Sequence, residues 1–582
     1  MSISTAKPDI QPATAPAEAE MPTRAAALLF QAKVMAHRAK RLATDLGNGP
    51  ARLGKIEADG FAIVAGQSRT ALWSDGLAQE RQLQLGKVQN LRRAAAALDG
   101  VTIPQGTVFS FWKQIGRASR RRGYVAGRML QQGCMVPAVG GGLCQLSNAL
   151  YDAALQAGCE IVERHAHSRI VPGSQAALGR DATVAWNYVD LRLRSPRDLR
   201  LQVQLDKNEL LVQFVAREPI ATMPSPIDLA FRAPDRAAQS CDTCNEIDCF
   251  RHIKPSAPSD RTTFVLDGMT PEFGDYVKAT RRSNDVLALP IDGQRWRMAR
   301  YAWPTDGFNA VHSAPLVTLQ RSLQSRRLAA QGAARQQALL HHAEILALAL
   351  ARRIPVEATE LCVAQSLLPF LWRNGDLGGR QVTVLMTRLP MDVLQARLDA
   401  VLAQHPDSTT LGDFRAPAEL VRAEREALDY ADRIVTPHSE VAGLFAGKAE
   451  LLPWHNQPAT PALAPTQRVA FVGPTLGRKG AYEMRDGARA LGLELVVGGS
   501  DLEAAEFWSG IAIHRGTPLQ AEIVVQPAYV EDNPRSLLTA LASGRQVIAT
   551  PACGLKPQPG LTLIPFGDSA ALVEALRVAL DR

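Results

Sequence analysis

The C-terminal half of the chain alternates short apolar runs with helical patterns. Between residues 466 and 582 the strand-like runs are RVAFVG, LELVVGG, AEIVVQP and RQVIAT, with a helix expected between each pair. Between 261 and 455 they are TTFVLDG, LCVAQSLL and VTVLMTR, with long helical patterns at 315–351 and 391–404. Short apolar strands separated by helices are typical of parallel sheets. We therefore predict two Rossmann-like lobes, 261–455 and 466–582, joined by a Pro-rich linker.

The remaining sequence divides into three parts. Residues 24–220 mix helical patterns with runs that read as strands, in order TVAWNYVDLRLRS, LRLQVQLD and ELLVQFV. This mixture predicts an α+β domain. Residues 1–23 are rich in Ala and Pro and predict a disordered tail without signal-peptide character. Residues 221–260 form a Pro-rich, Cys-containing module or linker. The predicted fold class is thus multidomain, α+β followed by α/β.

Composition restricts the location and the partners. The net charge of +8 over 582 residues is modest, which argues against a dedicated nucleic-acid-binding protein. No apolar run approaches the roughly 20 residues of a membrane-spanning helix. Eight cysteines fit a reducing compartment, and we predict a cytoplasmic protein. The basic helical stretch 24–46 is expected to dock on the next domain, and a peripheral membrane contact is its alternative.

A glycine run precedes Cys144. Gly140–Gly142 lead into apolar residues at helical spacing, so we expect Cys144 at a helix N-terminus, where free N–H groups favour a thiolate. His165, His167 and Asp181 follow. A thiol, an imidazole and a carboxylate can form a relay in which the imidazole is the base and the carboxylate orients it. The alternative is a buried thiol with histidines that bind backbone groups.

This region resembles the VanW family of bacterial proteins, because several motifs occur in the family's order over residues 85–205. They are a glycine run with Cys-Gln and a Ser-containing helix, an E-R-H-x-H-S segment, and G-R-D-A-T. The matching residues are Gly140–Gly142, Cys144, Gln145, Ser147, Tyr151, Glu163, Arg164, His165, His167, Ser168, Gly179, Arg180, Asp181, Ala182 and Thr183. The resemblance implies a link to the cell envelope and leaves the reaction open.

Two further groups of side chains could bind ligands. Arg117 and Arg120–Arg122 precede the glycine run and form either an anion-binding loop or a solvated basic loop. A cysteine cluster has the spacing C-x2-C-x4-C-x2-H and consists of Cys241, Cys244, Cys249 and His252. Three thiolates and an imidazole suit a structural zinc ion. A redox or iron–sulfur role and unligated thiols are the alternatives.

A second candidate site lies in the last lobe. Glu531 precedes a helix and should lie at the carboxyl edge of the sheet, where open α/β sheets bind ligands. The strand-to-helix turn with Gly473 and Gly480 carries Arg478 and Lys479. Backbone amides and two cations can hold a diphosphate.

These features resemble the donor-binding half of GT-B glycosyltransferases, especially the retaining family that uses nucleotide-activated sugars. The matching residues are Gly473, Lys479, Gly480, Glu531, Pro534, Ala540, Ala542, Gly544, Val547, Ile548, Ala549 and Thr550. The resemblance implies that Arg478 and Lys479 hold the donor diphosphate and that Glu531 reaches the sugar. Thr539 stands where the family has a second carboxylate, and a hydroxyl cannot clamp two ribose hydroxyls.

Together, these features predict a VanW-like protein with a glycosyltransferase-like region that transfers sugar from a nucleotide donor to an envelope glycan or precursor. Two alternatives remain open. One is a sugar- or nucleotide-binding protein without turnover, and the other is an enzyme of envelope metabolism centred on Cys144.

Overall fold

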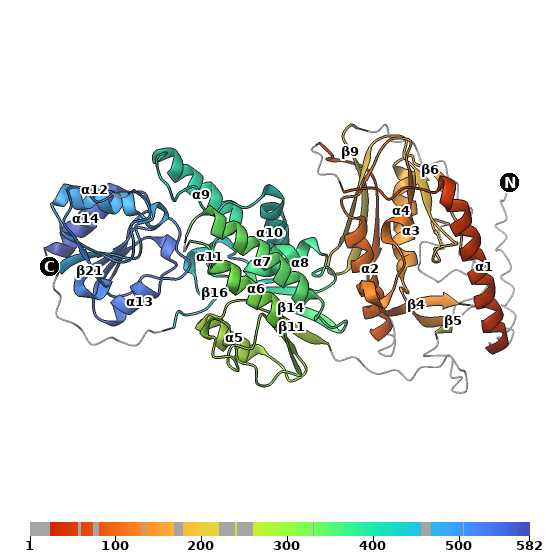
Figure 1. The fold of residues 1–582 in the computed structure, drawn as a ribbon, viewed down its shortest axis with the longest axis horizontal. Coiled ribbons are helices and arrows are strands. Elements are labelled where there is room, and N and C mark those ends of the chain that lie inside the picture. The colour runs from red at the N-terminus through yellow and green to blue at the C-terminus, as the bar shows by residue number, and fades with distance from the viewer. Residues whose placement is uncertain are drawn as a thin grey trace, which may run out of the picture.

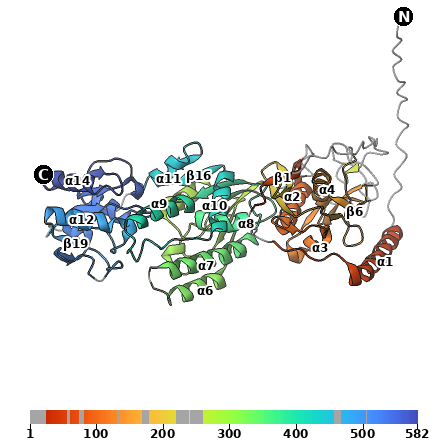
Figure 2. The ribbon, with the colours of Figure 1, turned by 90° about the horizontal axis from the view of Figure 1, so that it is seen from above.

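The computed structural model describes residues 24–55, 60–73, 81–131, 134–167, 179–219, 239–240, 260–329, 331–455, 467–504 and 506–581. The chain forms three bodies in sequence order along one axis, an N-terminal region followed by a first and a second lobe (Figures 1 and 2). The expected tail 1–23 and the cysteine cluster lie outside the described residues. No helix among the described residues is long and apolar enough to cross a membrane.

The N-terminal region is an α+β structure built around antiparallel strands. A four-stranded sheet has the order β1-β9-β8-β2, a second sheet the order β3-β7-β6, and a third joins β4 and β5 to the short β10. The bounds are α1 Arg24–Asn48, β1 Ile63–Ala71, α2 Arg81–Leu98, β2 Thr102–Ile103, β3 Val108–Ser110, α3 Phe111–Ile115, β4 Ala126–Gln131, β5 Cys134–Val139, α4 Leu143–Gln156, β6 Glu160–Glu163, β7 Arg192–Arg194, β8 Leu199–Leu205, β9 Glu209–Ala216 and β10 Gln239–Ser240.

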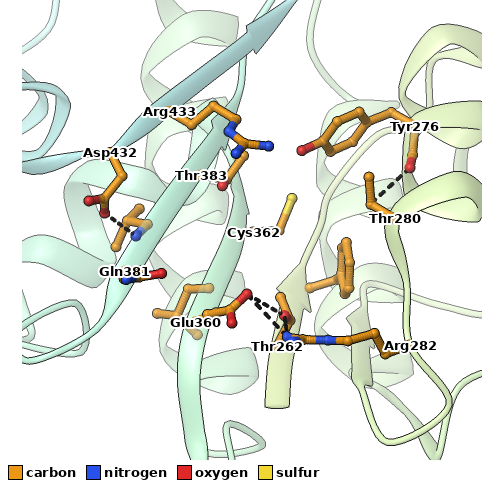
Figure 3. Close-up of a pocket in the computed structure, with 13 residues that line it drawn as sticks. Thr262, Tyr276, Thr280, Arg282, Glu360, Cys362, Gln381, Thr383, Asp432 and Arg433 are labelled. Atoms are coloured by element: carbon orange, nitrogen blue, oxygen red, sulfur yellow. Dashed lines mark hydrogen bonds and ion pairs between the residues drawn. The ribbon is translucent and has the colours of Figure 1, made fainter. Parts of the chain in front are cut away.

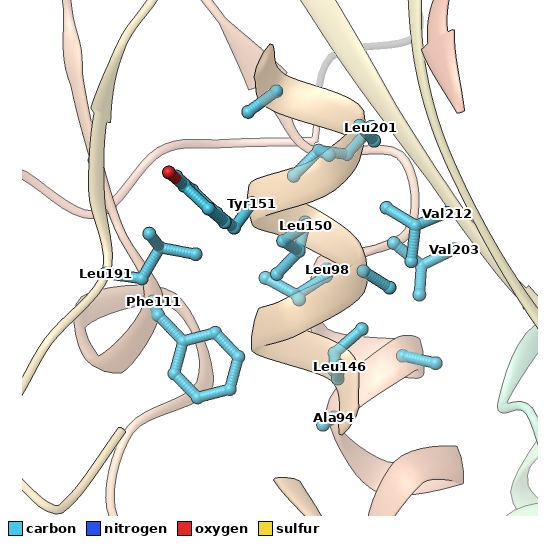
Figure 4. Close-up of a cluster of buried hydrophobic side chains, with 14 of the residues drawn as sticks. Ala94, Leu98, Phe111, Leu146, Leu150, Tyr151, Leu191, Leu201, Val203 and Val212 are labelled. Carbon is cyan, nitrogen blue, oxygen red and sulfur yellow. The ribbon is translucent and has the colours of Figure 1, made fainter. Parts of the chain in front are cut away.

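Helix α4 lies at the centre of this region. Its apolar residues Leu146 and Leu150 are fully buried against Leu98 of α2 and against the inner face of β8 and β9 (Figure 4). The alternating burial along β8 and β9 explains why one face of this sheet is apolar. The packing holds the first turn of α4, and hence Cys144, in a fixed place.

The first lobe is a seven-stranded, entirely parallel sheet with the order β13-β12-β11-β14-β15-β16-β17. Its elements are β11 Arg261–Val265, α5 Pro271–Thr280, β12 Val286–Leu289, β13 Ala310–Ser313, α6 Pro315–Ser325, α7 Ala333–Ala351, β14 Ala358–Ala364, α8 Leu368–Arg373, β15 Gln381–Leu385, α9 Met391–Gln404, α10 Ala418–Tyr430, β16 Arg433–Thr436, α11 Ser439–Leu444 and β17 Ala449–Leu451.

The second lobe is a six-stranded parallel sheet with the order β20-β19-β18-β21-β22-β23. Its elements are β18 Gln467–Phe471, α12 Ala481–Leu491, β19 Leu495–Val497, β20 Ile513–Arg515, β21 Ala521–Gln526, α13 Arg535–Ala542, β22 Gln546–Ala549, β23 Leu561–Leu563 and α14 Ser569–Leu580. This order is that of the Rossmann fold, and the first lobe shares it with one extra strand. The predicted fold class, an α+β region followed by two Rossmann-like lobes in tandem, is therefore confirmed.

Three details of the sequence prediction were wrong. The helical pattern 315–351 is two helices, because Gly332 has φ 112° and interrupts it before α7. The strand expected over 183–195 is confined to β7, since a turn closed by the Ala185–Val189 bridge precedes it. The helix expected between β19 and β21 is replaced, among the described residues, by turns and the short β20, so this unit is compressed.

Specific contacts join the three bodies. Arg92 of α2 donates to the carbonyl of Gly378 in the first lobe, and the amide of Gly379 donates to the carbonyl of Asp206 at 2.8 Å. Between the lobes, the ring of His438 lies 3.0 Å from the carbonyl of Glu531. Both candidate sites are therefore held on one connected framework.

Candidate functional sites

The glycine run before α4 is required by its surroundings. Gly140 and Gly142 have φ of 82° and 94°, values that favour glycine. A Cβ on Gly141 would lie 2.3 Å from the carbonyl oxygen of Gly127, and one on Gly142 would lie 2.2 Å from Cγ of Lys87. The glycines thus let the chain pass between α2 and β4 and deliver Cys144 to the first turn of α4.

His167 lies between Asp181 and Cys144. Its Nδ1 is 2.7 Å from Oδ2 of Asp181, and its backbone N–H donates to the same oxygen at 2.6 Å. Burial lowers the pKa of His167, but hydrogen bonds to Asp181 and to the Cys144 thiol raise it to about 9. With Nδ1 bound to the carboxylate, Nε2 is the ring nitrogen left for the thiol. The half-buried Cys144 also contacts the carbonyl oxygen of Val184, at 3.9 Å.

Asp181 is fixed from a second side by Arg164. Nη2 of Arg164 donates to Oδ1 of Asp181 at 2.7 Å, and its guanidinium stacks over the Tyr151 ring at 5.2 Å. Burial would raise the pKa of Asp181, but hydrogen bonds from His167 and the charge of Arg164 hold it below its ordinary value. The carboxylate is therefore charged and oriented at neutral pH.

Helix α4 also holds the segment that carries Asp181. Ser147 donates to the carbonyl of Ala182 at 2.6 Å, and the side chain of Asn148 accepts from the Ala182 amide at 2.8 Å. Arg180 pairs with Asp152, one turn further along α4, at 2.9 Å. The helix that presents the thiol therefore also positions the carboxylate.

The other predicted residues near Cys144 lie elsewhere. His165 is exposed, and its Nε2 is 3.2 Å from Glu163, so it does not share the site of His167. Gln145 donates to Thr70 and to the carbonyl of Ala71. The predicted cations Arg117 and Arg120–Arg122 are exposed, and Ser168 lies outside the described residues. Sequence reasoning missed Lys87, whose pKa is lowered to about 8 by burial and by the charge of Arg128.

The second candidate site lies where the strand order of the second lobe reverses. Arg478 and Lys479 follow β18, and Glu531 follows the neighbouring β21. Nζ of Lys479 is 2.9 Å from Oε2 of Glu531, and the amide of Asn533 donates to Oε1 at 3.0 Å. In open α/β sheets this reversal between adjacent strands is the usual place for a ligand.

Arg478 faces the first lobe. Its guanidinium lies over the ring of Phe414 at 4.8 Å, and burial lowers its pKa although Glu531, Asp532 and Asp413 oppose this. A half-buried cation that contacts both lobes is well placed for an anionic ligand between them.

Two glycines flank the turn that carries Lys479. Gly473 has φ 85° and lies against Lys479, and a Cβ on Gly480 would be 2.1 Å from the carbonyl oxygen of Pro527.

Thr539 donates to the carbonyl of Arg535 at 2.9 Å, one turn earlier in α13, so its hydroxyl is engaged within its own helix. Gln526, which donates to Glu531, was not predicted as a site residue. The sequence signal that could have found it is its position as the polar last residue of the apolar strand β21.

A groove of about 380 Å³ lies on the first lobe, away from both sites. Figure 3 shows charged residues from different elements along it, among them Arg282, Glu360 and Arg433. Arg282 pairs with Glu360 at 3.1 Å, and the groove borders the amino-terminal halves of β11, β14 and β15. Ligands of parallel sheets bind at the opposite, carboxyl edge. We assign the groove no role.

No group of three or more His, Cys, Asp or Glu side chains in the described part of the chain is placed to hold a metal ion. The predicted ligands Cys241, Cys244, Cys249 and His252 lie outside that part. The zinc site therefore stays a prediction.

The N-terminal region is similar in sequence to known proteins. Residues 86–215 match the family described as VanW like protein, which confirms the resemblance predicted over 85–205. The vancomycin B-type resistance protein VanW of Enterococcus faecalis (strain ATCC 700802 / V583) is 33% identical over 159 residues, covering 26% of this chain and 57% of that protein. The uncharacterized protein YoaR of Bacillus subtilis (strain 168) is 37% identical over 106 residues, covering 18% and 34%. The chain thus spans between a third and somewhat more than half of these relatives.

Solved structures resemble the C-terminal half of the chain, with low TM-scores. Sucrose-phosphate synthase from Thermosynechococcus elongatus has a TM-score of 0.33 and 15% identity, covering 56% of this chain and 90% of that chain. WaaG, a glycosyltransferase involved in lipopolysaccharide biosynthesis, has a TM-score of 0.32 and 14% identity, covering 55% and 90%. We base the fold of the two lobes on their strand order instead.

Proposed function

We propose that the two Rossmann-like lobes bind a nucleotide-activated sugar and transfer it to a cell-envelope glycan or precursor. One observation carries the proposal: Arg478, Lys479 and Glu531 meet where the strand order of the second lobe reverses, beside the first lobe. Two cations with a carboxylate match a diphosphate joined to a sugar, since the cations bind the phosphates and the carboxylate accepts from sugar hydroxyls.

In this reaction the chain stabilises a leaving diphosphate. Arg478 and Lys479 would neutralise the charge that develops when the bond to the sugar breaks, and the partial desolvation of Arg478 strengthens this interaction. Without donor, Lys479 pairs with Glu531. A bound diphosphate would draw Lys479 away and release the carboxylate for the sugar.

Donor binding tests the proposal. Lys479→Ala should weaken binding of UDP-, GDP- or ADP-glucose at least tenfold by calorimetry, since an ionic contact to phosphate is lost. Lys556→Ala removes an exposed cation of the same lobe and is the matched control. Equal affinities of Lys479→Ala and the control for the donor that wild type binds would contradict the proposal, as would a wild type that binds none of the three.

We propose a second, separate activity at Cys144, favoured by the bridge of His167 between Asp181 and the thiol. A protonated imidazole beside a thiol favours the thiolate, which is the nucleophile in acyl transfer. Cys144 would attack an acyl carbon, His167 would give its proton to the leaving group, and an acceptor nucleophile or water would release the acyl group and return a proton to His167.

The two histidines provide a matched pair for this test. His167→Asn should slow alkylation of Cys144 by iodoacetamide at least tenfold at pH 7.5, since the thiolate loses its cationic partner. His165→Asn should leave the rate unchanged, because His165 contacts Glu163. Equal slowing in both variants, or in neither, would refute the assignment of His167.

A further inference from the structure

Helix α1 contacts the rest of the protein through a narrow polar seam. Within it, Nε of Arg38 donates to the carbonyl of Trp186, Arg41 pairs with Glu163, and Asp45 pairs with Arg192 at 2.7 Å. Among the helix side chains that the structure describes, Val34 alone is buried. Helix α1 docks on the N-terminal region, as predicted, but it does so through polar groups, which leaves its apolar residues outside.

The face of α1 next to this seam, roughly a third of a turn around the helix, carries an exposed apolar stripe. Its large residues are between 59% and 85% exposed, and the alanines between them are exposed as well. The stripe consists of Leu28, Ala32, Met35, Ala39, Leu42 and Leu46, with Leu29 beside it. Steps of four and three residues alternate along the stripe, which is the spacing of a helix–helix seam. Figures 1 and 2 both place α1 at the outer edge of the molecule, opposite the second lobe.

We propose that this stripe pairs with α1 of a second copy of the chain, antiparallel, to form a symmetric dimer. The pattern is self-complementary, because reversing the helix about position 37 superimposes the stripe on itself. The facing pairs, one residue from each copy, are Leu28 with Leu46, Ala32 with Leu42, and Met35 with Ala39. Two of the three pairs set a large residue against an alanine, which is the alternation that lets surfaces interlock. A two-fold dimer requires such a self-matching patch.

The size of the stripe predicts a weak, reversible dimer. A fully exposed large side chain offers roughly 100 Å² of apolar surface, and weighted by their exposed fractions the five large residues offer about 350 Å² per copy, or about 700 Å² for the pair. Alanines and aliphatic stems bring this close to the ~1,000 Å² at which specific interfaces begin. The cations Lys33 and Lys40 lie to the side of the stripe, so they do not oppose the contact.

The composition of the stripe favours a helix over a lipid surface as its partner. Helices that lie in a membrane interface carry bulky Trp, Phe and Leu residues on the buried face, with aromatic rings common among them. The stripe contains no aromatic residue, and its alanines suit the close approach of another helix backbone.

Sedimentation velocity of the full chain from 5 to 200 μM tests the dimer. Wild type should shift from monomer to dimer with concentration, and Met35→Lys with Leu42→Lys should remain monomeric. Thr44→Lys, exposed on the same helix but outside the stripe, should dimerise as wild type does. Unchanged circular dichroism would exclude unfolding of the double variant.

Cross-linking tests the register. A mixture of Met35→Cys and Ala39→Cys proteins should give a disulfide-linked heterodimer under mild oxidation, because these positions face one another only in the antiparallel pairing. Efficient cross-linking of Met35→Cys protein alone indicates a parallel pairing and overturns the proposal. Wild type that stays monomeric at 200 μM, or that instead sediments with phosphatidylglycerol vesicles through the stripe, overturns it too.

Discussion

The carboxylate of Asp181 should set the titration of His167. In the native protein the pKa of His167 rises from 6.5 to about 9. At about 1.36 kcal/mol per unit, this corresponds to roughly 3 kcal/mol of preference for the protonated ring. Asp181→Asn keeps the shape of the side chain and removes its charge. We expect the pKa of His167 to fall by at least one unit, or roughly 1.4 kcal/mol.

The titration can be followed directly by NMR of histidine labelled with ¹³C at Cε1, with the His167 resonance assigned by its absence in His167→Asn. Glu160→Gln is the matched control, since this exposed carboxylate lies on β6, just before the loop that carries His167, and pairs with Arg194. A wild-type His167 that titrates near 6.5, or an equal pKa in wild type and Asp181→Asn, would refute the reasoning.

The raised pKa of His167 also determines how its contact with Asp181 contributes to the free energy of unfolding at different pH values. Because the folded pKa lies above 6.5, the protonated His167 stabilises the fold fully below about pH 6.5. This contribution is lost as pH rises through about 9. Alkylation of Cys144 should therefore lose its dependence on His167 above that pH.

Three other substitutions test the packing and the second site. Gly142→Ala should destabilise the protein by about 2 kcal/mol in thermal melting, since φ is 94° and the new Cβ meets the side chain of Lys87. Thr539→Glu should raise donor affinity in calorimetry if the missing ribose clamp limits binding, and an unchanged affinity would count against that role. Arg535→Ala should cost roughly 3 kcal/mol at pH 7, because Glu272 would stay buried without its cation. Arg535 holds the pKa of Glu272 below its ordinary value against burial, so this cost should shrink as pH falls below about 4.5.

Local patterns predicted the sheets and the two sites because their signals lie within short stretches. Buried parallel strands read as apolar runs, and close backbone approach before Cys144 demands glycine. The choice between His165 and His167 could not be read in this way. Both follow β6 on one short loop, and the contact of Asp181, fourteen residues later, decides which ring turns inward.

The orientation of α1 could not be predicted for a related reason. Its amphipathic pattern indicates an apolar face, and burial of that face is the ordinary expectation. The polar partners that hold the other face come from residues more than a hundred positions away, such as Glu163 and Arg192. Helical periodicity carries no information about contacts of that range.

The contact between the N-terminal region and the first lobe restricts how the two proposed activities can cooperate. Gly378 packs so closely on Leu205 that a Cβ would lie 2.7 Å from its side chain, and Arg92 is buried where it donates to the Gly378 carbonyl. Motion between the N-terminal region and the first lobe would break the hydrogen bond of Arg92 and leave its buried guanidinium without a partner there, which costs free energy. Cys144 is therefore fixed relative to the first lobe, and a lobe closure around a donor would have to move the second lobe. Because Cys144 lies in the N-terminal region and not in the second lobe, its loss should leave donor affinity at Lys479 unchanged.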